Sequence, residues 1–389
     1  MYPDLSFFLK EVFGINLLLP IKTFGLFMAI SFMGAYWVMY KELKRKTIEK
    51  LMPLETIIVK TGKKSTLNDL ILYIVFGFFI GYKLGLVLSD YGTFANDPQV
   101  VIFSLSGNFI AGLIGAVLFG LYIYRDYSRK EEIKEVEVTT GAYDLHLGNF
   151  TAIAAIAGIL GAKIFHNLEN IDELIEDPIG SLLSFSGLTF YGGLICAAIG
   201  VIYYSKKKNI PLVPLLDCFA PAMMLAYGIG RVGCHLSGDG DWGIENVWPK
   251  PDLIAFLPDW FWSYDYPHNV VNAGELLPGA TSDHFQRHLV PSVFPTALYE
   301  AITCILLFFM LWSLRKKIKT PGLLFGIYLF INGLERFLIE KIRVNPDYHF
   351  FGIAATQATI ISIALMFGGI AMIWYALKQN KKPTNNVIT

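Results

Sequence analysis

The chain has 389 residues, of which 54% are hydrophobic, 15% aromatic and only 16% charged, and its formal net charge is zero. So much apolar surface exceeds what a soluble domain of this length needs, which predicts an integral membrane protein. The neutral balance argues against a nucleic-acid partner, so the placement of the charges carries the information.

Apolar runs long enough to cross a bilayer occur nine times. A hydrocarbon core about 30 Å thick needs roughly 20 mostly apolar residues per helix. The sequence therefore predicts an all-α, polytopic membrane helix bundle of about nine transmembrane helices, which forms a single membrane domain over residues 1–389. The predicted spans are residues 19–40, 69–88, 101–124, 150–168, 187–204, 214–236, 296–314, 322–341 and 354–377.

Basic residues alternate with acidic or neutral loops along these spans. Lys and Arg gather after the first, third, fifth, seventh and ninth spans, as at residues 206–208. By the positive-inside rule this pattern predicts an outer N-terminus and a cytoplasmic C-terminus. The first ten residues include Asp4 and precede no small-residue cleavage site, so no removable signal peptide is expected.

A two-helix unit recurs with an offset of eighty residues. Gly81-Tyr-Lys83 aligns with Gly161-Ala-Lys163 and, after a one-residue slip, Ala111-Gly-Leu-Ile114 aligns with Gly192-Gly-Leu-Ile195. We interpret residues 69–148 as a duplicated two-helix insertion. The first copy has Ile110 where the second has Tyr191, so the polar apparatus is expected in the second copy and the first is a structural spacer.

The sixth span carries charge into its outer end. Arg231 and His235 lie in an apolar helix that then breaks into glycines and acids. An Arg in a spanning segment costs roughly 2.5 to 3.5 kcal/mol on insertion scales, so it usually faces water or a partner and serves a function. The alternative is a simple helix C-terminus, where Arg complements the helix dipole.

Gly230 and Gly233 belong to a G-x-G-x-x-G run in this segment, but no strand precedes the run and no βαβ unit surrounds it. A dinucleotide site is therefore excluded. We expect the glycines to narrow or unwind the helix end, so that a headgroup reaches backbone N–H groups beside Arg231.

Residues 237–295 form the only large external segment, called the cap below. The cap is rich in aromatic residues and Pro, and most of its aromatics are typical of the interfacial belt. We expect a small element that lies on the outer leaflet over the mouth of the bundle.

The four cysteines, Cys196, Cys218, Cys234 and Cys304, lie within or beside predicted spans with no paired spacing. This pattern excludes a zinc ribbon or a disulfide framework, and no metal-ligand cluster is evident. The cysteines are interpreted as small buried hydrophobic residues, and only Cys234 lies inside a charged motif.

The eighth predicted span carries a polar stripe at its outer end. Asn332, Arg336, Glu340 and Arg343 are spaced i, i+4, i+8 and i+11, which places them on one helix face. Glu340 is expected to hold Arg336 and Arg343 and to leave one guanidinium free to bind phosphate with two donors. The alternative is that Lys341 and Arg343 only snorkel to the interface.

Together these motifs resemble the family of bacterial phosphatidylglycerol–prolipoprotein diacylglyceryl transferases. Gly230-Arg-Val-Gly-Cys-His-Leu-Ser-Gly-Asp-Gly-Asp-Trp-Gly243 is similar to the family signature G-R-x-G-N-F-x-N-G-E-x-W-G, with one extra residue. Phe294-Pro-Thr-Ala-Leu-Tyr-Glu300 resembles H-P-[ST]-Q-L-Y-E, and Arg336, Glu340 and Arg343 match R-x-x-x-E-x-x-R. With Ser186-Gly-Leu-Thr-Phe-Tyr-Gly-Gly-Leu-Ile195, the resemblance covers most of residues 150–377.

The resemblance implies a reaction. Such enzymes transfer the diacylglyceryl group of phosphatidylglycerol to the lipobox cysteine thiol of a prolipoprotein and release glycerol 1-phosphate at the outer leaflet of the bacterial plasma (inner) membrane. This thioether formation is the first step of lipoprotein maturation, and the scheme needs no cofactor and no metal.

The resemblance also assigns roles to residues. Arg231 and Arg336 are expected to stabilise the departing phosphate, with Glu340 as a further member of the catalytic set. The expected substrate-binding residues are Gly192, Gly193, Gly230, Gly233, Ser237, Asp239, Tyr299, Glu300, Asn332 and Arg343.

The chain departs from the family pattern at the base. Tyr191 replaces the family's His before Gly-Gly, Cys234-His235 replaces Asn-Phe, and Asn332 stands where a Tyr often precedes the late Arg. We predict that His235 accepts the thiol proton, because a positive charge four residues earlier favours neutral imidazole, and that Tyr191 positions substrate. The alternative is an interfacial His235 with a local hydrogen bond.

A multi-pass transporter of an anionic solute is the competing interpretation, supported by the repeat and the paired arginines. A transporter should hold its charges near the midplane, between the repeat copies. Here the charges gather at the outward ends of single helices, which favours an enzyme acting on lipid. A purely structural scaffold leaves Arg336 unexplained.

Overall fold

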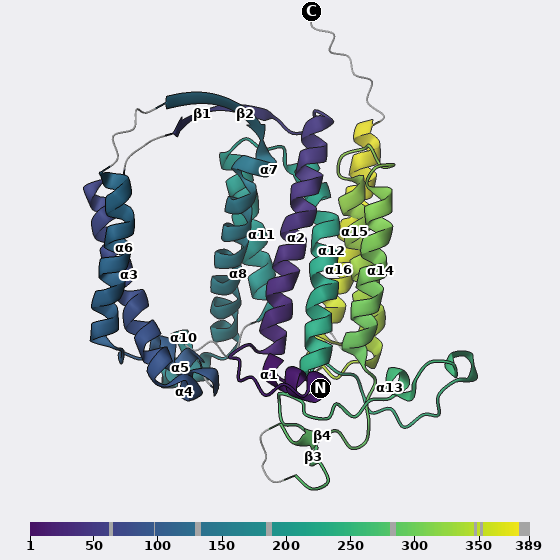
Figure 1. The fold of residues 1–389 in the computed structure, drawn as a ribbon. Coiled ribbons are helices and arrows are strands. Elements are labelled where there is room, and N and C mark those ends of the chain that lie inside the picture. Colours follow the sequence, from purple (N-terminus) through teal and green to yellow (C-terminus); the bar gives the residue numbers. More distant parts are fainter. Residues whose placement is uncertain are drawn as a thin grey trace, which may run out of the picture.

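The computed structural model describes most of the chain, and what it describes is mainly helical (Figure 1). The described residues are 1–61, 65–96, 98–128, 134–183, 189–280, 285–345, 348–350 and 353–380. Among these residues, six helices are long and apolar enough to cross a membrane, which confirms a polytopic membrane protein: α2 (Thr23–Ile48), α3 (Leu67–Ser89), α8 (Leu147–Glu169), α12 (Leu212–Ser237), α14 (Thr296–Leu314) and α16 (Gln357–Asn380).

The three other predicted spans also contain helices. The stretch Phe109–Arg125 of α6 (Phe109–Tyr127) is a shorter apolar helix, and α11 (Phe190–Lys207) and α15 (Leu323–Ile339) have 18 and 17 residues. The predicted start of the third span at residue 101 is wrong, because residue 101 lies in the separate short helix α5 (Pro98–Phe103) and α6 begins only at Phe109. The Asn108 side chain accepts the backbone N–H of Ala111 and so caps the new helix.

Helix α12 is the centre of the main bundle and packs against α2, α14 and α15, while α16 packs against α15 (Figure 1). Their shared core contains fully buried Leu43, Leu215, Met224 and Leu311. At Gly228 a side chain would lie 2.9 Å from Ile305, so the absence of one lets α12 and α14 approach closely. The central position of α12 places the residues of its C-terminal turns inside protein rather than in lipid.

Two helix pairs with matching residue spacing, α3 with α6 and α8 with α11, lie beside this bundle. Helix α8 begins and ends 80 residues after α3, and α11 begins 81 residues after α6. The short helices α9 (Ile171–Glu176) and α10 (Pro178–Leu183) follow α4 (Tyr91–Asn96) and α5 by the same 80 residues. Figure 1 shows α3 and α6 farthest from the bundle, with α8 and α11 between.

A β-ribbon connects the outlying pair to the rest. Strand β1 (Leu54–Thr61) precedes α3 and pairs antiparallel with β2 (Lys134–Gly141), which follows α6. The hydroxyls of Thr56 and Thr139 lie 2.9 Å apart across the ribbon. The all-helical prediction did not include these strands, whose β-branched residues favour extended backbone.

The remaining elements are short. Helix α1 (Leu5–Phe13) lies near the cap, and α7 (Ala142–Leu145) joins β2 to α8. The cap itself is mostly irregular and contains η1 (Asp252–Ile254), α13 (Asp259–Trp262), β3 (Glu275–Leu276) and β4 (Arg287–His288). After α15 come η2 (Glu340–Ile342), β5 (Tyr348–Phe350) and β6 (Ile353–Ala355).

Buried ions lie at the end of the bundle opposite the cap. Lys46 of α2 donates to Asp217 of α12 over 3.1 Å, and both side chains are buried. Asp217 also accepts the backbone N–H groups of Gly322 and Phe325, so it caps the start of α15. On the same end, Arg315 of α14 binds the buried carboxylate of Glu42 at 2.8 Å.

Candidate functional site

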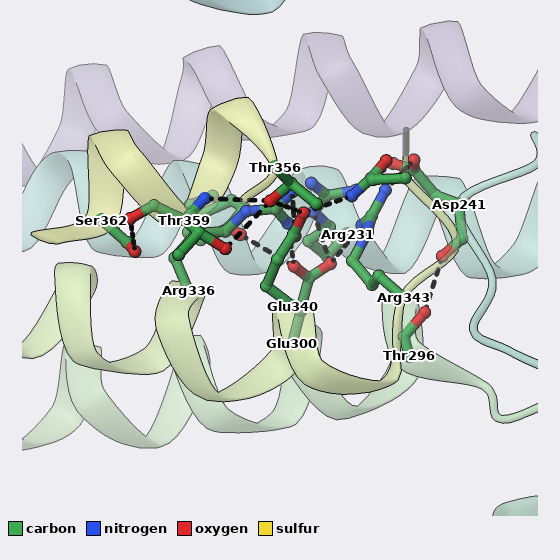
Figure 2. A network of polar contacts seen from close by, with 12 residues as sticks. Arg231, Asp241, Thr296, Glu300, Arg336, Glu340, Arg343, Thr356, Thr359 and Ser362 are labelled. Atoms are coloured by element: carbon green, nitrogen blue, oxygen red, sulfur yellow. Dashed lines mark hydrogen bonds and ion pairs between the residues drawn. The ribbon is translucent and has the colours of Figure 1, made fainter. Parts of the chain in front are cut away.

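Three arginines share one buried carboxylate at the cap end of the bundle. Glu300 of α14 is 0% exposed; it forms an ion pair with Arg231, whose Nε lies 2.9 Å from one carboxylate oxygen, and its other oxygen accepts from Arg336 Nη1 at 2.7 Å. Arg343 Nη1 approaches the same carboxylate at 3.3 Å. Figure 2 shows these guanidinium groups converging on Glu300 from α12, from α15 and from the segment after η2.

Asp241 lies on the other side of these arginines. The three arginines and the acids that pair with them are called the arginine cluster below. The carboxylate of Asp241 accepts from both Arg231 and Arg343, and its backbone carbonyl accepts from the Thr296 hydroxyl at 2.9 Å. Burial alone would raise the pKa of Asp241, but the charges of Arg231 and Arg343 hold it below its ordinary value. Asp241 therefore stays ionised and fixes two guanidinium planes.

The sequence analysis selected Asp239 rather than Asp241. The extra residue in the motif left two acids where the family signature has one, and spacing could not show which of them pairs with Arg231. Burial, and then the charge of Asp241, raise the pKa of Asp239. The usable signal was that Asp241 directly precedes Trp242-Gly243, the end of the signature.

Glu340 binds only one of the two arginines predicted for it. Its carboxylate lies 3.0 Å from Arg336 Nη2 and also accepts from Asn345 and Thr356, each at 2.6 Å. The expectation that Glu340 also holds Arg343 is wrong. Helix α15 ends at Ile339 and gives way to η2, so the helical phase is lost before the extended Arg343.

Three guanidinium groups pair with the carboxylates of Glu300, Asp241 and Glu340. Asp241 is 33% exposed, whereas the other two carboxylates are buried, so Asp241 is the acid of the cluster nearest the protein surface. Arg343 Nε is buried without a hydrogen-bond partner among the described residues, which leaves a donor for an incoming anion.

Tyr227 is a member of the cluster that the sequence analysis missed. It lies one helical turn before Arg231, its ring faces that guanidinium at 5.3 Å, and its hydroxyl donates to Glu300 over 3.1 Å. The i, i+4 spacing to Arg231 was the available signal. Tyr227 therefore supports both the cation and its acceptor.

Helix α12 continues without a break past the glycines. The expectation that Gly230 and Gly233 unwind its end is wrong, because α12 remains helical to Ser237 and stops at Gly238 in the left-handed conformation. A side chain at Gly233 would lie 2.7 Å from Phe27 of α2, so this glycine permits helix packing. A side chain at Gly230 would meet only Met28 at 3.9 Å, so this position does not require glycine for packing.

His235 contacts the cap rather than the arginine cluster. The buried imidazole packs against Tyr264 and Tyr266, and Nδ1 lies 3.1 Å from the Tyr266 hydroxyl. Within the described part of the chain, no hydrogen bond or ring contact joins His235 to Arg231, and no hydrogen bond engages Nε2 of its imidazole. Ser237 is also buried and donates to the carbonyl of Cys234.

Cys234 lies beside two acids. Its sulfur and carboxylate oxygens of Asp239 and Asp241 all lie within 4.8 Å of one another, a spacing compatible with a metal ion. Both oxygens of Asp241 already accept from guanidinium groups, which compete with a metal for them. The donor set therefore fits an ion-paired site better than a metal centre.

The glycines of the Tyr-Gly-Gly motif serve helix packing. Side chains at Gly192 and Gly193 would meet the carbonyl oxygens of Gly161 and Gly158 on α8 at 2.8 and 2.9 Å. Tyr191 precedes them at the start of α11, is half-buried, and interacts electrostatically with Arg336. The motif residues 186–188 lie outside the described residues.

Two further predicted residues lie near the cluster. The Tyr299 hydroxyl donates to the carbonyl of Phe261 over 2.6 Å and so connects α14 to the cap. Asn332 lies one turn before Arg336 on α15 and is half-buried. Both flank the cluster, and no contact with its carboxylates is recorded among the described residues.

Comparison with known proteins identifies relatives of the chain. Residues 10–139 and 113–375 match the model of the family described as prolipoprotein diacylglyceryl transferase. A phosphatidylglycerol–prolipoprotein diacylglyceryl transferase of Clostridium tetani is 32% identical over 202 residues, which is 52% of this chain and 70% of the relative. The enzyme of that name from Pseudoalteromonas atlantica is 25% identical over 320 residues, 77% of this chain and 97% of the relative.

Proposed function

The chain belongs to the prolipoprotein diacylglyceryl transferase family of multi-pass bacterial membrane proteins, and from that premise we propose that phosphatidylglycerol is its donor and a lipobox cysteine its acceptor. The cysteine sulfur forms a bond to a glyceryl carbon as the bond from that carbon to the phosphate oxygen breaks. The products are a thioether and glycerol 1-phosphate, and the thiol proton passes to a base. The reaction takes place at the outer leaflet of the plasma membrane.

The arginine cluster is the observation that carries this proposal. The departing phosphate gains negative charge as its ester bond breaks, and fixed guanidinium groups lower the energy of that state. Glu300 and Asp241 hold the arginines in place before substrate arrives, so little reorganisation is needed. Donors such as Arg343 Nε, which the carboxylates leave unused, bind the phosphate oxygens.

His235 is proposed as the proton acceptor. A thiol is a weak nucleophile until it becomes thiolate, so the reaction needs a base near the acceptor cysteine. The hydrogen bond between Nδ1 and Tyr266 fixes the imidazole and leaves Nε2 as the reactive nitrogen. A purely structural His235, held by that same hydrogen bond, is the alternative.

Tyr191 is proposed to position substrate. Its position at the start of α11 and its electrostatic interaction with Arg336 support this role. Two further predicted substrate-binding residues, Asn332 and Tyr299, belong to α15 and α14.

The proposal is tested by reconstituting the purified protein with phosphatidylglycerol and a synthetic lipobox peptide. Transfer raises the peptide mass by one diacylglyceryl group on cysteine, and a peptide with Ser in place of that cysteine gains nothing. The competing transporter would instead move an anionic solute into vesicles and leave the peptide unchanged. A folded protein that modifies no lipobox peptide contradicts the proposal.

A further inference from the structure

A loop of the cap presents large apolar side chains away from the protein. The segment 247–262, called the aromatic loop below, leaves Leu253 86% and Phe256 82% exposed, and Val247, Trp248 and Trp260 are exposed as well. Figure 1 shows this part of the chain, which includes α13, extending sideways beyond the end of the bundle. Water-soluble surfaces rarely gather so many large apolar residues on one projecting segment.

Hydrogen bonds within the aromatic loop fix its backbone, and this conformation directs the apolar side chains outward. The ammonium group of Lys250 donates to the carbonyls of Ala255 and Leu257 and to the Asp259 carboxylate. The Trp262 indole N–H donates to the carbonyl of Trp248 over 3.0 Å. Polar backbone groups thus turn inward while apolar groups turn outward, the arrangement that suits an apolar surrounding.

The base of the loop is fixed to the start of α14. Rings of Trp248 and Trp262 pack on Phe294 with centroids 5.9 and 5.1 Å apart, and Tyr299 binds the carbonyl of Phe261. Beyond this point α14 exposes Leu306 to the surroundings of the bundle. The loop therefore continues the apolar surface of a spanning helix at the level where that helix meets the interface.

We propose that the aromatic loop lies in the outer leaflet of the bilayer, with Leu253 and Phe256 among the lipid acyl chains. Tryptophan is typical of this depth, and the loop carries two of its Trp side chains exposed. Its acids outnumber its single lysine, so apolar insertion rather than attraction to anionic headgroups holds it there.

This inference extends the proposed function, on which its role in catalysis rests. The base of the loop packs on Phe294 and Tyr299, which directly precede or lie beside Glu300 at the start of α14. Lipid that contacts the inserted loop therefore meets the protein at the segment that carries the shared carboxylate of the arginine cluster. The loop marks the side of the protein from which the lipid donor enters.

Site-directed labelling tests the location independently of activity. The variants Phe256→Cys and Asp259→Cys are reconstituted in phosphatidylglycerol–phosphatidylcholine nanodiscs and labelled with an environment-sensitive fluorophore, with labelled unsubstituted protein as the background. Asp259 is the matched control, because its side chain is 98% exposed on the same loop but charged. We expect doxyl-labelled lipid to quench the probe at 256 several-fold more than at 259, and aqueous iodide to do the reverse.

Equal iodide quenching at both positions overturns the inference. Protection of the probe at 256 accompanied by energy transfer between labelled protein molecules also overturns it, because a second copy of the chain would then cover this position. The quenching result stands even if the protein modifies no lipobox peptide, so the two failures are distinguishable. If transfer is present, the double variant Leu253→Ser/Phe256→Ser should raise the apparent KM for phosphatidylglycerol several-fold and leave kcat within about twofold. A drop in kcat at unchanged KM would contradict the entry role.

Discussion

Arg231 and Arg336 bind different oxygens of the same buried carboxylate. Nε of Arg231 lies 2.9 Å from Oε2 of Glu300, and Nη1 of Arg336 lies 2.7 Å from Oε1. Two cations 105 residues apart in the chain are thereby held at a fixed separation on either side of one acid. A phosphate group needs donors in such a fixed arrangement to be recognised through several oxygens at once.

Replacing Glu300 by Gln is the first test of this arrangement. The amide keeps the volume but leaves three guanidinium groups without their common charge, and breaking a buried ion pair typically costs about 3–5 kcal/mol. We expect transfer to fall at least about 100-fold, with a lowered melting temperature in detergent. Glu42→Gln, at the other buried carboxylate pair, should lower the melting temperature while a folded fraction retains its kcat. Full activity of Glu300→Gln would contradict the assigned role.

Arg231→Lys and Arg336→Lys test the guanidinium geometry. Lysine keeps the charge but cannot bridge two acceptors with fixed donors, as Arg231 bridges Glu300 and Asp241. Each variant should reduce kcat/KM by about 100-fold or more. Arg315→Lys, which keeps a charge beside Glu42 at the far end of the bundle, should stay within about threefold of the parent protein.

Asp241 and Asp239 should respond oppositely to replacement by Asn. The lowered pKa of Asp241 means that its ion pairs stabilise the fold above the ordinary value of 3.8 and are lost only as the pH falls through the lower folded value. The raised pKa of Asp239 means that its ionisation disfavours the fold as the pH rises above 3.8. At pH 7, Asp241→Asn should therefore lower the melting temperature and Asp239→Asn should leave it equal or higher. The reverse order would contradict the pairing.

His235→Asn tests the proposed base. Loss of a general base typically lowers kcat by about 100- to 10,000-fold, whereas loss of a local hydrogen bond to Tyr266 alone would lower stability and spare the rate. His288→Asn is the control, since that histidine lies in the cap and its imidazole binds only Asp265 among the described residues. Undiminished transfer by folded His235→Asn would rule out the proton-accepting role.

Chelation should leave the reaction unchanged. The proposed chemistry uses guanidinium groups for charge stabilisation. Both carboxylate oxygens of Asp241 already accept hydrogen bonds from Arg231 and Arg343. We expect the transfer rate after treatment with EDTA to equal that of untreated protein. A loss of rate that added zinc restores would instead assign Cys234, Asp239 and Asp241 to a metal.

Local pattern predicted the helices well and their ends less well. Apolar runs of about 20 residues identify spanning helices because lipid requires them, and six are confirmed by length and composition. The end of α15 could not be read from spacing, because the change to η2 at Glu340 depends on contacts with Asn345 and Thr356. The β1–β2 ribbon was likewise hidden, since its strands lie 80 residues apart.

The candidate site was predicted residue by residue but not pair by pair. Arg231, Glu300, Arg336 and Arg343 were predicted from motifs, but Glu340 was predicted to be the acid that holds Arg336 and Arg343. Glu300 has that part instead, because the approach of α14 to α12 and α15 places its carboxylate among the three arginines. The residue spacing within each of these helices cannot reveal such a contact between helices.

The shared acceptor also has a consequence for biosynthesis. The ribosome makes Arg231 69 residues before Glu300, and makes Arg343 43 residues after it. Until α14 is inserted, Asp241 is the nearest acid that can neutralise the first arginine. Until α15 follows, the carboxylate of Glu300 has only one of its three cations. A nascent chain that stops between residues 300 and 336 thus has two of these carboxylates and only one of their cations, which makes such unfinished molecules chemically distinct from finished ones for membrane quality control.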